Sequence, residues 1–273
     1  MPAPSTVTAF IRSFSCAIVT GGSSGIGRAI VSRIHEHAPE LPVFNLSRTP
    51  PTGAGIHPNL THVTCDLTQP AAVEEVVRRL SGLMPGEGRM LLINNSGFGS
   101  YGEFPSPGLA RNLEMIDLNV RAVVQLTGLL WPALRSRGGM VVNVASLAGY
   151  QPTPLMATYA ATKAFVLNWS VALDAEARAH GIRCVAICPG PVSTNFSKAA
   201  GFESPTGVGG QTAEACAEET LAAMAAEAPE RVTGLRNRLL SVVSARLPKP
   251  WAAAVGLRLI RRLRLDRLLK RQG

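Results

Sequence analysis

A glycine-rich turn between an apolar run and a helical repeat constrains the fold of this chain more than any other feature. Residues 14–20 are mostly apolar and predict a short β-strand, and residues 28–34 resume with the spacing of a helix. The turn between them supplies the candidate cofactor-binding residues Gly21, Ser23, Ser24, Gly25, Ile26 and Gly27. Glycines permit a tight turn, and a helix N-terminus presents unpaired N–H groups and a partial positive charge to phosphate. This order of strand, turn and helix therefore predicts a nucleotide-binding site.

Further apolar runs alternate with helical repeats along the chain, as in an α/β protein. Strands are expected at 42–46, 61–65, 89–93, 140–145 and 182–188, and helices at 71–80, 109–135, 159–180 and 213–227. A chain of 273 residues with 46% hydrophobic and 16% charged residues suits one large domain with a buried core. We expect this domain to span 1–235, with residues 1–13 loose, and residues 236–273 to form a basic helical extension.

Polar residues at the ends of two predicted strands suit the adenosine end of a dinucleotide. Ser47 and Arg48 follow the strand at 42–46. A cation at this point favours the 2′-phosphate of NADP, whereas an acid would favour NAD. We therefore expect NADP, with NAD as the alternative if Arg48 is only a solvated loop charge. Asp66 and Leu67 follow the strand at 61–65, where the carboxylate could accept a hydrogen bond from adenine or cap the next helix.

Two further turns and one helix carry polar residues where a cofactor would lie. The turn after 89–93 contributes Asn95, Ser96 and Gly97, and we expect its role to be partly structural because asparagine amides can join neighbouring strands. The turn after 182–188 contributes Pro189, Gly190, Val192 and Thr194. Asn119 lies inside the apolar helix predicted at 109–135, where a buried amide requires a backbone or water partner.

Three residues could form a proton-transfer site. Tyr159 and Lys163 are four residues apart, so on a helix they share one face, and a nearby ammonium could hold the phenol partly ionised. Ser146 follows the predicted strand at 140–145 and would lie at the carboxyl edge of the sheet. A hydroxyl at a strand end that faces a phenol on a helix can clamp a carbonyl group between them.

Together these residues resemble the short-chain dehydrogenase/reductase family. The resemblance covers about 14–235 and consists of Thr20 to Gly27, Asp66, Asn94 to Gly97, Asn119, Ser146, Tyr159-Ala-Ala-Thr-Lys163 and Pro189-Gly190. Ser96 departs from the alanine that is usual in the family. The loop at 95–104 and the arginine-rich ending resemble the branch that includes DltE-like, hydroxysteroid and long-chain ketoacyl reductases. The resemblance implies a single Rossmann-type, doubly wound parallel sheet flanked by helices, in a homodimer or homotetramer.

The resemblance also implies a mechanism and a reaction. Tyr159 would be the general acid in reduction and the base in oxidation, and Lys163 would lower the pKa of the phenol and bind the nicotinamide ribose. Ser146 would polarise the carbonyl, and Asn119 would hold a water that links Lys163 to solvent. The expected activity is NADP(H)-dependent hydride transfer to or from a ketone or secondary alcohol of a hydrophobic substrate, such as a ketoacyl or steroid-like compound. The alternatives are an NAD-preferring alcohol dehydrogenase and a non-catalytic dinucleotide-binding or interaction protein on the same fold.

Aromatic residues near the predicted site could line a hydrophobic substrate mouth or merely cover the core. The candidates for substrate contact are Phe98, Tyr101, Tyr150 and Phe196. Residues 196–212 are rich in glycine, serine, proline and threonine, and they are expected to form a lid.

Charge and cysteine content bound the remaining functions. The net charge is +9, yet residues 231–273 hold twelve Lys and Arg against one Asp, so the rest of the chain is nearly neutral. Peripheral contact of 236–273 with anionic lipid and a subunit or intramolecular contact both remain open, while nucleic-acid binding is not expected because no binding motif accompanies the cations. The five cysteines lack metal-ligand spacing, so a cytoplasmic protein without a metal is expected. No apolar stretch predicts a membrane span or a signal peptide.

Overall fold

The computed structural model describes residues 2–53, 56–194, 196 and 210–262 of the chain. Its strands are β1 (Phe14–Thr20), β2 (Val43–Ser47), β3 (Leu60–Thr64), β4 (Arg89–Asn94), β5 (Gly139–Val144), β6 (Ile182–Cys188), β7 (Val192–Ser193), β8 (Gln211–Thr212) and β9 (Glu230–Val232). Its α-helices are α1 (Pro4–Ile11), α2 (Gly25–His37), α3 (Pro70–Ser81), α4 (Leu109–Ile116), α5 (Ala122–Arg137), α6 (Ala157–Ala177), α8 (Ala213–Ala225), α9 (Leu235–Arg246) and α10 (Lys249–Arg262).

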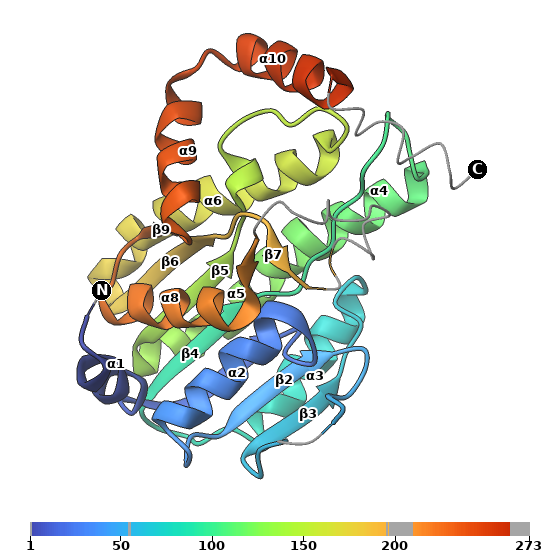
Figure 1. The fold of residues 1–273 in the computed structure, drawn as a ribbon. Helices are drawn as coiled ribbons and strands as arrows, with labels where there is room; N and C mark the ends of the chain where they lie inside the picture. Colours follow the sequence, from blue (N-terminus) through green and yellow to red (C-terminus); the bar gives the residue numbers. More distant parts are fainter. Residues whose placement is uncertain (1, 54–55, 195, 197–209, 263–273) are drawn as a thin grey trace.

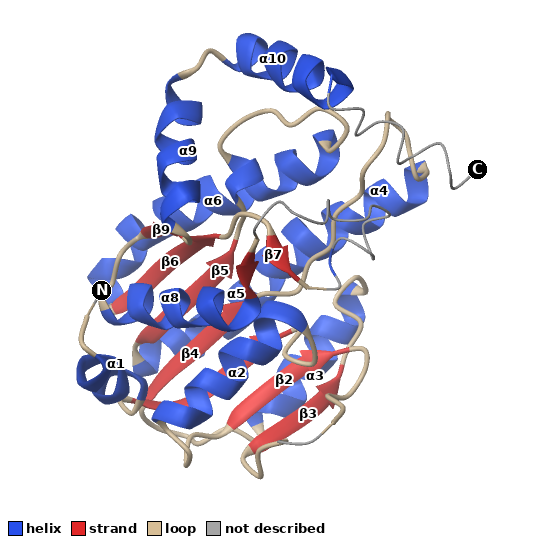
Figure 2. Cartoon of the chain, viewed as in Figure 1, coloured by secondary structure: helices blue, strands red, loops and turns tan. Residues whose placement is uncertain are grey.

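Seven strands form one parallel sheet with the order β3-β2-β1-β4-β5-β6-β9 (Figure 2). The chain moves outward from β1 to β3 and then returns to start the other half at β4. The turns after β1 and β4 therefore leave the sheet in opposite directions, and such a switch point is where open α/β sheets bind ligands. The expected doubly wound sheet is confirmed.

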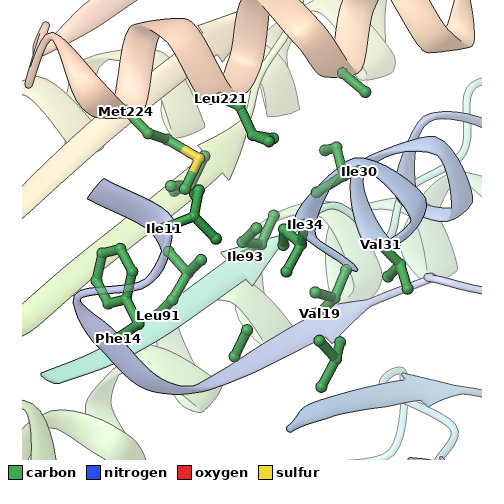
Figure 3. Packing of buried hydrophobic residues seen from close by; sticks show 14 of the residues in the cluster. Ile11, Phe14, Val19, Ile30, Val31, Ile34, Leu91, Ile93, Leu221 and Met224 are labelled. Carbon is green, nitrogen blue, oxygen red and sulfur yellow. The ribbon is translucent and has the colours of Figure 1, made fainter. Parts of the chain in front are cut away.

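Helices cover both faces of the sheet, which explains why the central strands read as continuous apolar runs. On one face, α1, α2 and α8 pack against β1, β4, β5 and β6 (Figures 1 and 3). On the other face, α3 and α5 pack against the same central strands. In β5, every residue is buried.

The expectation that residues 1–13 are loose is wrong for residues 4–11. Residues 4–11 form α1, whose Val7 and Ile11 are buried against the first face of the sheet (Figure 3). Phe10 and Phe14 meet edge to edge, with ring centroids 5.2 Å apart. Only Val7 and Ile11, four residues apart, are buried in α1, and two positions are too few to produce a recognisable helical repeat in the sequence.

The helix expected at 109–135 is interrupted. Between α4 and α5, residues Asp117–Arg121 form a π-helical turn that contains Asn119. A π turn inserts one residue into a helix, and such turns occur frequently at functional sites.

Helices α9 and α10 follow β9 and lie beyond α6 (Figure 1). Glu219 on α8 anchors the start of α9, because its carboxylate accepts hydrogen bonds from Gly234 N (3.0 Å) and Arg238 Nη2 (2.6 Å). Gln151 anchors the end of α9, because its amide donates to the carbonyls of Ser244 and Leu247. Within the described ranges, no helix is long and apolar enough to cross a membrane. The division of the chain at residue 235 stays a prediction.

Candidate active site

The glycine turn after β1 is shaped by close packing of backbone on backbone. Gly21 and Gly25 have φ values of +69° and +53°, which other residues rarely adopt. A Cβ on Gly27 would lie 2.3 Å from the carbonyl oxygen of Gly21, so only glycine lets α2 start this close to β1. Ser24 is the N-cap of α2 and makes no side-chain cap hydrogen bond. The N-terminal N–H groups of α2 can therefore receive a pyrophosphate.

Thr20 joins the two turns at the switch point. Its Oγ1 accepts hydrogen bonds from the backbone N–H groups of Asn95 and Ser96, both at 2.9 Å. The Asn95 amide donates back to the Thr20 carbonyl at 2.9 Å. The expected structural role of this turn is thus found in Asn95, which holds β4 to β1 beneath the glycine turn. Thr20 was recognised only as part of the family pattern, since a threonine at a strand end has no distinctive signal.

The expected 2′-phosphate residues gather around a single backbone carbonyl. The hydroxyls of Ser23 and Ser47 lie 2.7 Å apart, and both donate to the carbonyl of Thr49. The Arg48 side chain is 65% exposed and lies 3.9 Å from Glu114, so this guanidinium is held only weakly. A loosely held guanidinium can bind a phosphate at this edge of the sheet, and the two hydroxyls could donate to it once they release the Thr49 carbonyl.

Asp66 does not cap α3, whose N-cap is Gln69. Instead, its Oδ1 accepts from the backbone N–H (3.0 Å) and the hydroxyl (2.7 Å) of Thr68. Burial acts to raise the pKa of Asp66, but these hydrogen bonds and the charge of Arg48 outweigh it and lower the pKa. The turn keeps Asp66 and the neighbouring Leu67 at the edge where adenine would lie.

Tyr159 and Lys163 project from the first two turns of α6 and are both buried. The Lys163 Nζ donates to the carbonyl of Val144 at 2.7 Å and lies 6.0 Å from the centre of the Tyr159 ring. Ser146 follows β5, and its Oγ accepts from the Ala148 N–H at 3.1 Å. The structure brings all three residues together at the carboxyl edge of β5.

The protein alone does not ionise this tyrosine. Burial raises the pKa of Tyr159 to about 12, although its interaction with the Ser146 hydroxyl acts in the opposite direction. Burial also lowers the pKa of Lys163 to about 8, so part of the lysine's charge is lost near neutral pH. Within the chain itself the interaction that lowers the Tyr159 pKa comes from Ser146 and not from Lys163, so the expectation that Lys163 lowers this pKa stays a prediction.

Asn119 is held by backbone groups. Its Oδ1 accepts from Phe98 N at 3.2 Å, and its Nδ2 donates to Phe98 O at 2.9 Å and to Thr162 Oγ1 at 3.1 Å. This pairing fixes the loop after β4 to the π turn and to α6. A Cβ on Gly97 would lie 2.9 Å from Asn119 Oδ1 and 3.3 Å from Lys163 Nζ, so Gly97 is the point at which these two groups meet. The water expected at Asn119 stays a prediction.

A buried polar network joins Asn94, where an asparagine was expected to link neighbouring strands, to Thr127, Asn143 and Ser170, which the sequence did not single out. The Asn94 amide donates to Asn143 Oδ1 at 2.8 Å and to Thr127 Oγ1 at 3.1 Å. The Asn143 amide donates in turn to Ser170 Oγ at 2.9 Å. Asn143 was detectable as the one polar residue inside the apolar run of β5, and the network fixes β4, β5, α5 and α6 relative to one another.

Two of the four candidate substrate residues surround Tyr159. Phe98 and Phe196 pack with Met115 and Tyr159, and the Tyr159 and Phe196 rings lie 5.6 Å apart. Phe98 is buried beneath the Arg111 guanidinium, which lies 3.6 Å from its ring centre, so it serves the core as well.

The other two candidates have different positions. Tyr150 packs with Val232 and donates its hydroxyl proton to Glu230, and it does not join the cluster around Tyr159, so its expected substrate role is not supported. Burial is the main cause of the raised pKa of Tyr150. Tyr101 is half-buried in the loop after β4. Most of the expected lid, 197–209, lies outside the described residues.

The turn after β6 closes the site from the other side. The carbonyl of Pro189 accepts from Leu147 N at 2.8 Å, which joins this turn to the one that carries Ser146. Gly190 faces Asn237 of α9, since a Cβ there would lie 2.4 Å from the asparagine side chain. Thr194 approaches the glycine turn, because a Cβ on Gly25 would lie 3.5 Å from its Cγ2. Val192 in β7 is half-buried between these two contacts.

A pocket of about 250 Å³ lies at the start of α6. Its lining includes Ser100, Leu155, Thr158, Leu257 and Arg261, so α10 contributes one wall of this pocket, although the described lining contains none of the three candidate catalytic residues. A larger cavity of about 790 Å³ lies between α2 and α8, and its described lining contains none of the three candidate catalytic residues. Within the described part of the chain, no three His, Cys, Asp or Glu residues are grouped so that they could hold a metal ion.

Comparison with known proteins matches this geometry to one family. The family model for short chain dehydrogenases matches residues 15–203. The very-long-chain 3-oxoacyl-CoA reductase of Anas platyrhynchos is 30% identical over 209 residues, covering 70% of this chain and 64% of that protein. The 17-beta-hydroxysteroid dehydrogenase type 3 of Mus musculus is 32% identical over 205 residues, covering 70% and 65%. The match thus spans less than two thirds of either relative.

A solved structure agrees. A short-chain dehydrogenase from Sphingobium yanoikuyae in complex with NADPH superposes with a TM-score of 0.70 at 25% identity, covering 85% of this chain and 94% of that one. The resemblance drawn from the sequence is confirmed, including its hydroxysteroid and ketoacyl relatives. The chain belongs to the short-chain dehydrogenase family of oxidoreductases.

Proposed function

We propose that this protein is an NADP(H)-dependent reductase of hydrophobic ketones, or the corresponding secondary-alcohol dehydrogenase, with Tyr159 as its proton donor. The observation that carries the proposal is the convergence of Ser146, Tyr159 and Lys163 at the carboxyl edge of β5, next to the switch point. A bound NADPH supplies the hydride, and the groups of the chain bind, orient and protonate the substrate.

Ser146 and Tyr159 would hold the carbonyl oxygen between them. The Ser146 oxygen accepts from Ala148 N and its hydroxyl interacts with Tyr159, so the Ser146 proton would turn from the phenol to the substrate carbonyl. The phenol with a pKa of about 12 is fully protonated at neutral pH, so Tyr159 is ready to donate as negative charge develops on the carbonyl oxygen. In the oxidation direction Tyr159 must act as a phenolate. Positive charge near the phenol ring must then lower the pKa of Tyr159.

Lys163 would bind the nicotinamide ribose and return the proton to Tyr159. With a pKa of about 8 it can both donate and accept a proton near neutral pH. Its Nζ lies at the junction of Gly97 and Asn119, where the π turn approaches the site.

The preference for NADP rests on Ser23, Ser47 and Arg48. The two hydroxyls lie 2.7 Å from each other and would donate to a 2′-phosphate in place of the Thr49 carbonyl, while Arg48 follows on the exposed side as a cation. The NADPH complex of the Sphingobium relative supports the same choice. NADH is the competing cofactor.

A hydrophobic substrate is favoured by the wall around Tyr159. Phe98, Met115 and Phe196 surround the phenol with apolar side chains, and the pocket at the start of α6 adds Leu155 and Leu257. The names of the two relatives state a very-long-chain 3-oxoacyl-CoA and a hydroxysteroid, and the acyl chain of the one and the ring system of the other are apolar.

Turnover with a panel of ketones and ketoacyl thioesters tests the proposal. The protein should oxidise NADPH faster than NADH with at least one member, and Tyr159→Phe should abolish this turnover while NADPH binding persists. Tyr150→Phe is the matched control, because that tyrosine lies outside the cluster around Tyr159. Undiminished turnover by Tyr159→Phe would refute the proton-donor role. NADPH binding without turnover across the panel would favour a dinucleotide-binding protein without catalysis.

Exposed apolar side chains on α4, α5 and α6 support the proposal of a homodimer or homotetramer. Leu113, Ile116, Leu129 and Phe165 are each between 39% and 51% exposed on these helices. Light scattering of the purified protein would measure the mass directly, and a monomer at micromolar concentration would contradict this proposal.

A further inference from the structure

The outward faces of α9 and α10 carry apolar side chains that nothing in the described chain covers. On α9, Leu235, Leu239, Leu240, Val242 and Val243 are between 51% and 73% exposed. On α10, the exposed fraction is 71% for Trp251, 56% for Val255 and 54% for Leu259. Isolated exposed apolar residues are normal, but an array of this size on consecutive helices marks an interaction surface.

These residues follow helical spacing and so form stripes. In α10, Trp251, Val255 and Leu259 are four residues apart, and Arg258 and Arg262 are exposed beside them. Within the described residues α10 spans Lys249–Arg262, and Trp251, Val255 and Leu259 form the stripe.

The inner faces of the two helices are fixed to the catalytic domain. In α9, Arg238 is bound to Glu219, and Ser241 is buried. In α10, Gly256 lies against Pro154, since a Cβ there would be 3.5 Å from the proline Cδ. Contacts between the inner faces and the catalytic domain therefore fix the positions of the apolar side chains on the outward faces.

Charge decides between the candidate partners. Residues 235–262 contain seven Lys and Arg and no Asp or Glu. A second copy of this chain that docked through the same faces would bring Arg236, Arg246, Arg258 and Arg262 against identical cations, which opposes a symmetric contact. An anionic phospholipid surface complements both features of these faces. Its negative charge attracts the arginines, and its apolar layer can accommodate the tryptophan and aliphatic side chains.

We propose that the outward faces of α9 and α10 dock the protein on the surface of a bilayer that contains anionic phospholipid. The aliphatic and tryptophan side chains enter the interface, and the arginines beside them contact lipid phosphates. This docking is peripheral and goes beyond the proposed reaction, because it involves none of the residues placed in the active site.

Vesicle flotation of the full chain tests the proposal. The protein should float with vesicles of phosphatidylcholine and phosphatidylglycerol, should not float with phosphatidylcholine alone, and should dissociate at high salt. The double variant Val255→Ser/Leu259→Ser should bind at least about 10-fold more weakly, because two interfacial side chains are lost. The double variant Ile56→Ser/Leu83→Ser is its matched control, since these side chains are 52% and 51% exposed elsewhere on the surface and should leave binding unchanged.

A second pair of variants isolates the charge. Arg258→Gln/Arg262→Gln should weaken binding about 30-fold, the effect expected for two cations near the surface. Arg78→Gln/Arg135→Gln, which removes two exposed arginines on α3 and α5, should have no such effect. Circular dichroism of each variant establishes that it is folded.

Two results would overturn the proposal. One is absence of flotation with anionic vesicles, or flotation equal in the α10 variants and their controls. The other is self-association that Val255→Ser/Leu259→Ser abolishes, in a protein that does not bind vesicles, which would assign the surface to a second copy. Because flotation needs neither cofactor nor substrate, its failure leaves the proposed reaction untouched.

Discussion

Lys163→Met should stabilise the folded protein while it destroys the proposed activity. The lysine is 5% exposed, and burial lowers its pKa from 10.5 to about 8. A pKa difference of this size corresponds to about 3 kcal/mol of unfavourable burial of the charged form. Methionine removes that cost but leaves the Val144 carbonyl without its 2.7 Å donor, which costs about 1–2 kcal/mol. The net gain at neutral pH should therefore be about 1–2 kcal/mol.

The pH dependence of this gain identifies its cause. The folded protein releases the Lys163 proton near pH 8, whereas the unfolded chain holds it up to about pH 10.5. Between these values the unfolded state binds more protons, so wild-type stability rises with pH relative to the variant, and the advantage of methionine disappears. Below about pH 8 both states of the wild type are protonated, and the advantage stays constant.

Urea unfolding at several pH values between about 7 and 10 measures this difference. Lys249→Met is the matched control, because Lys249 is exposed on α10 and its substitution should produce no pH-dependent difference. A Lys163→Met protein that is less stable than wild type at neutral pH would refute the reasoning. So would a stability difference that does not change between about pH 7 and pH 10.

Three further predictions concern other parts of the fold. Burial, reinforced by the charge of His57, lowers the pKa of His35 from 6.5 to about 4, so the unfolded chain binds more protons between these pH values. When the pH falls from about 7 to 5, wild-type stability in urea unfolding should therefore decrease by about 2 kcal/mol more than the stability of His35→Gln. Equal decreases in the two proteins would contradict this. Gly27→Ala should destabilise the folded protein by more than about 2 kcal/mol or abolish NADPH binding, because the new Cβ would lie 2.3 Å from a backbone oxygen. The control Gly128→Ala, where a Cβ would meet nothing within 4 Å, should be neutral or stabilising in thermal unfolding. Arg48→Gln should raise the KM for NADPH about 10-fold and leave that for NADH unchanged, and a parallel change for both cofactors would remove the 2′-phosphate role.

The central strands could be predicted from the sequence because they are buried on both faces. The expected runs at 89–93 and 182–188 correspond to β4 (Arg89–Asn94) and β6 (Ile182–Cys188) within one residue. Short peripheral elements could not, since β9 has three residues of which only Val232 is buried. The π turn at Asp117–Arg121 has no periodicity of its own, so the sequence reads as one uninterrupted helix.

The site was predictable in its residue types and less so in its contacts. A hydroxyl after β5 and a Tyr-x-x-x-Lys repeat on α6 identify Ser146, Tyr159 and Lys163, and the structure brings them together. Two of the three hydrogen bonds of Asn119 are made with backbone groups of Phe98, which no side-chain pattern reveals. The direction of the Tyr159 pKa depends on how far burial exceeds the nearby charge, and burial is a property of the folded chain alone.

The pocket at the start of α6 has one wall on the catalytic domain and the other on α10. Thr158 adjoins the proposed proton donor, and Leu257 and Arg261 belong to the helix whose opposite face carries the exposed stripe. A ligand that fills this pocket therefore binds two elements at once and opposes their separation. Suppose that a partner bound to α10 changes the affinity of the pocket for its ligand by some factor. By thermodynamic reciprocity, the ligand in the pocket then changes the affinity of α10 for that partner by the same factor. The amount of ligand in the pocket and the fraction of protein bound through α10 would then depend on each other through one coupling free energy.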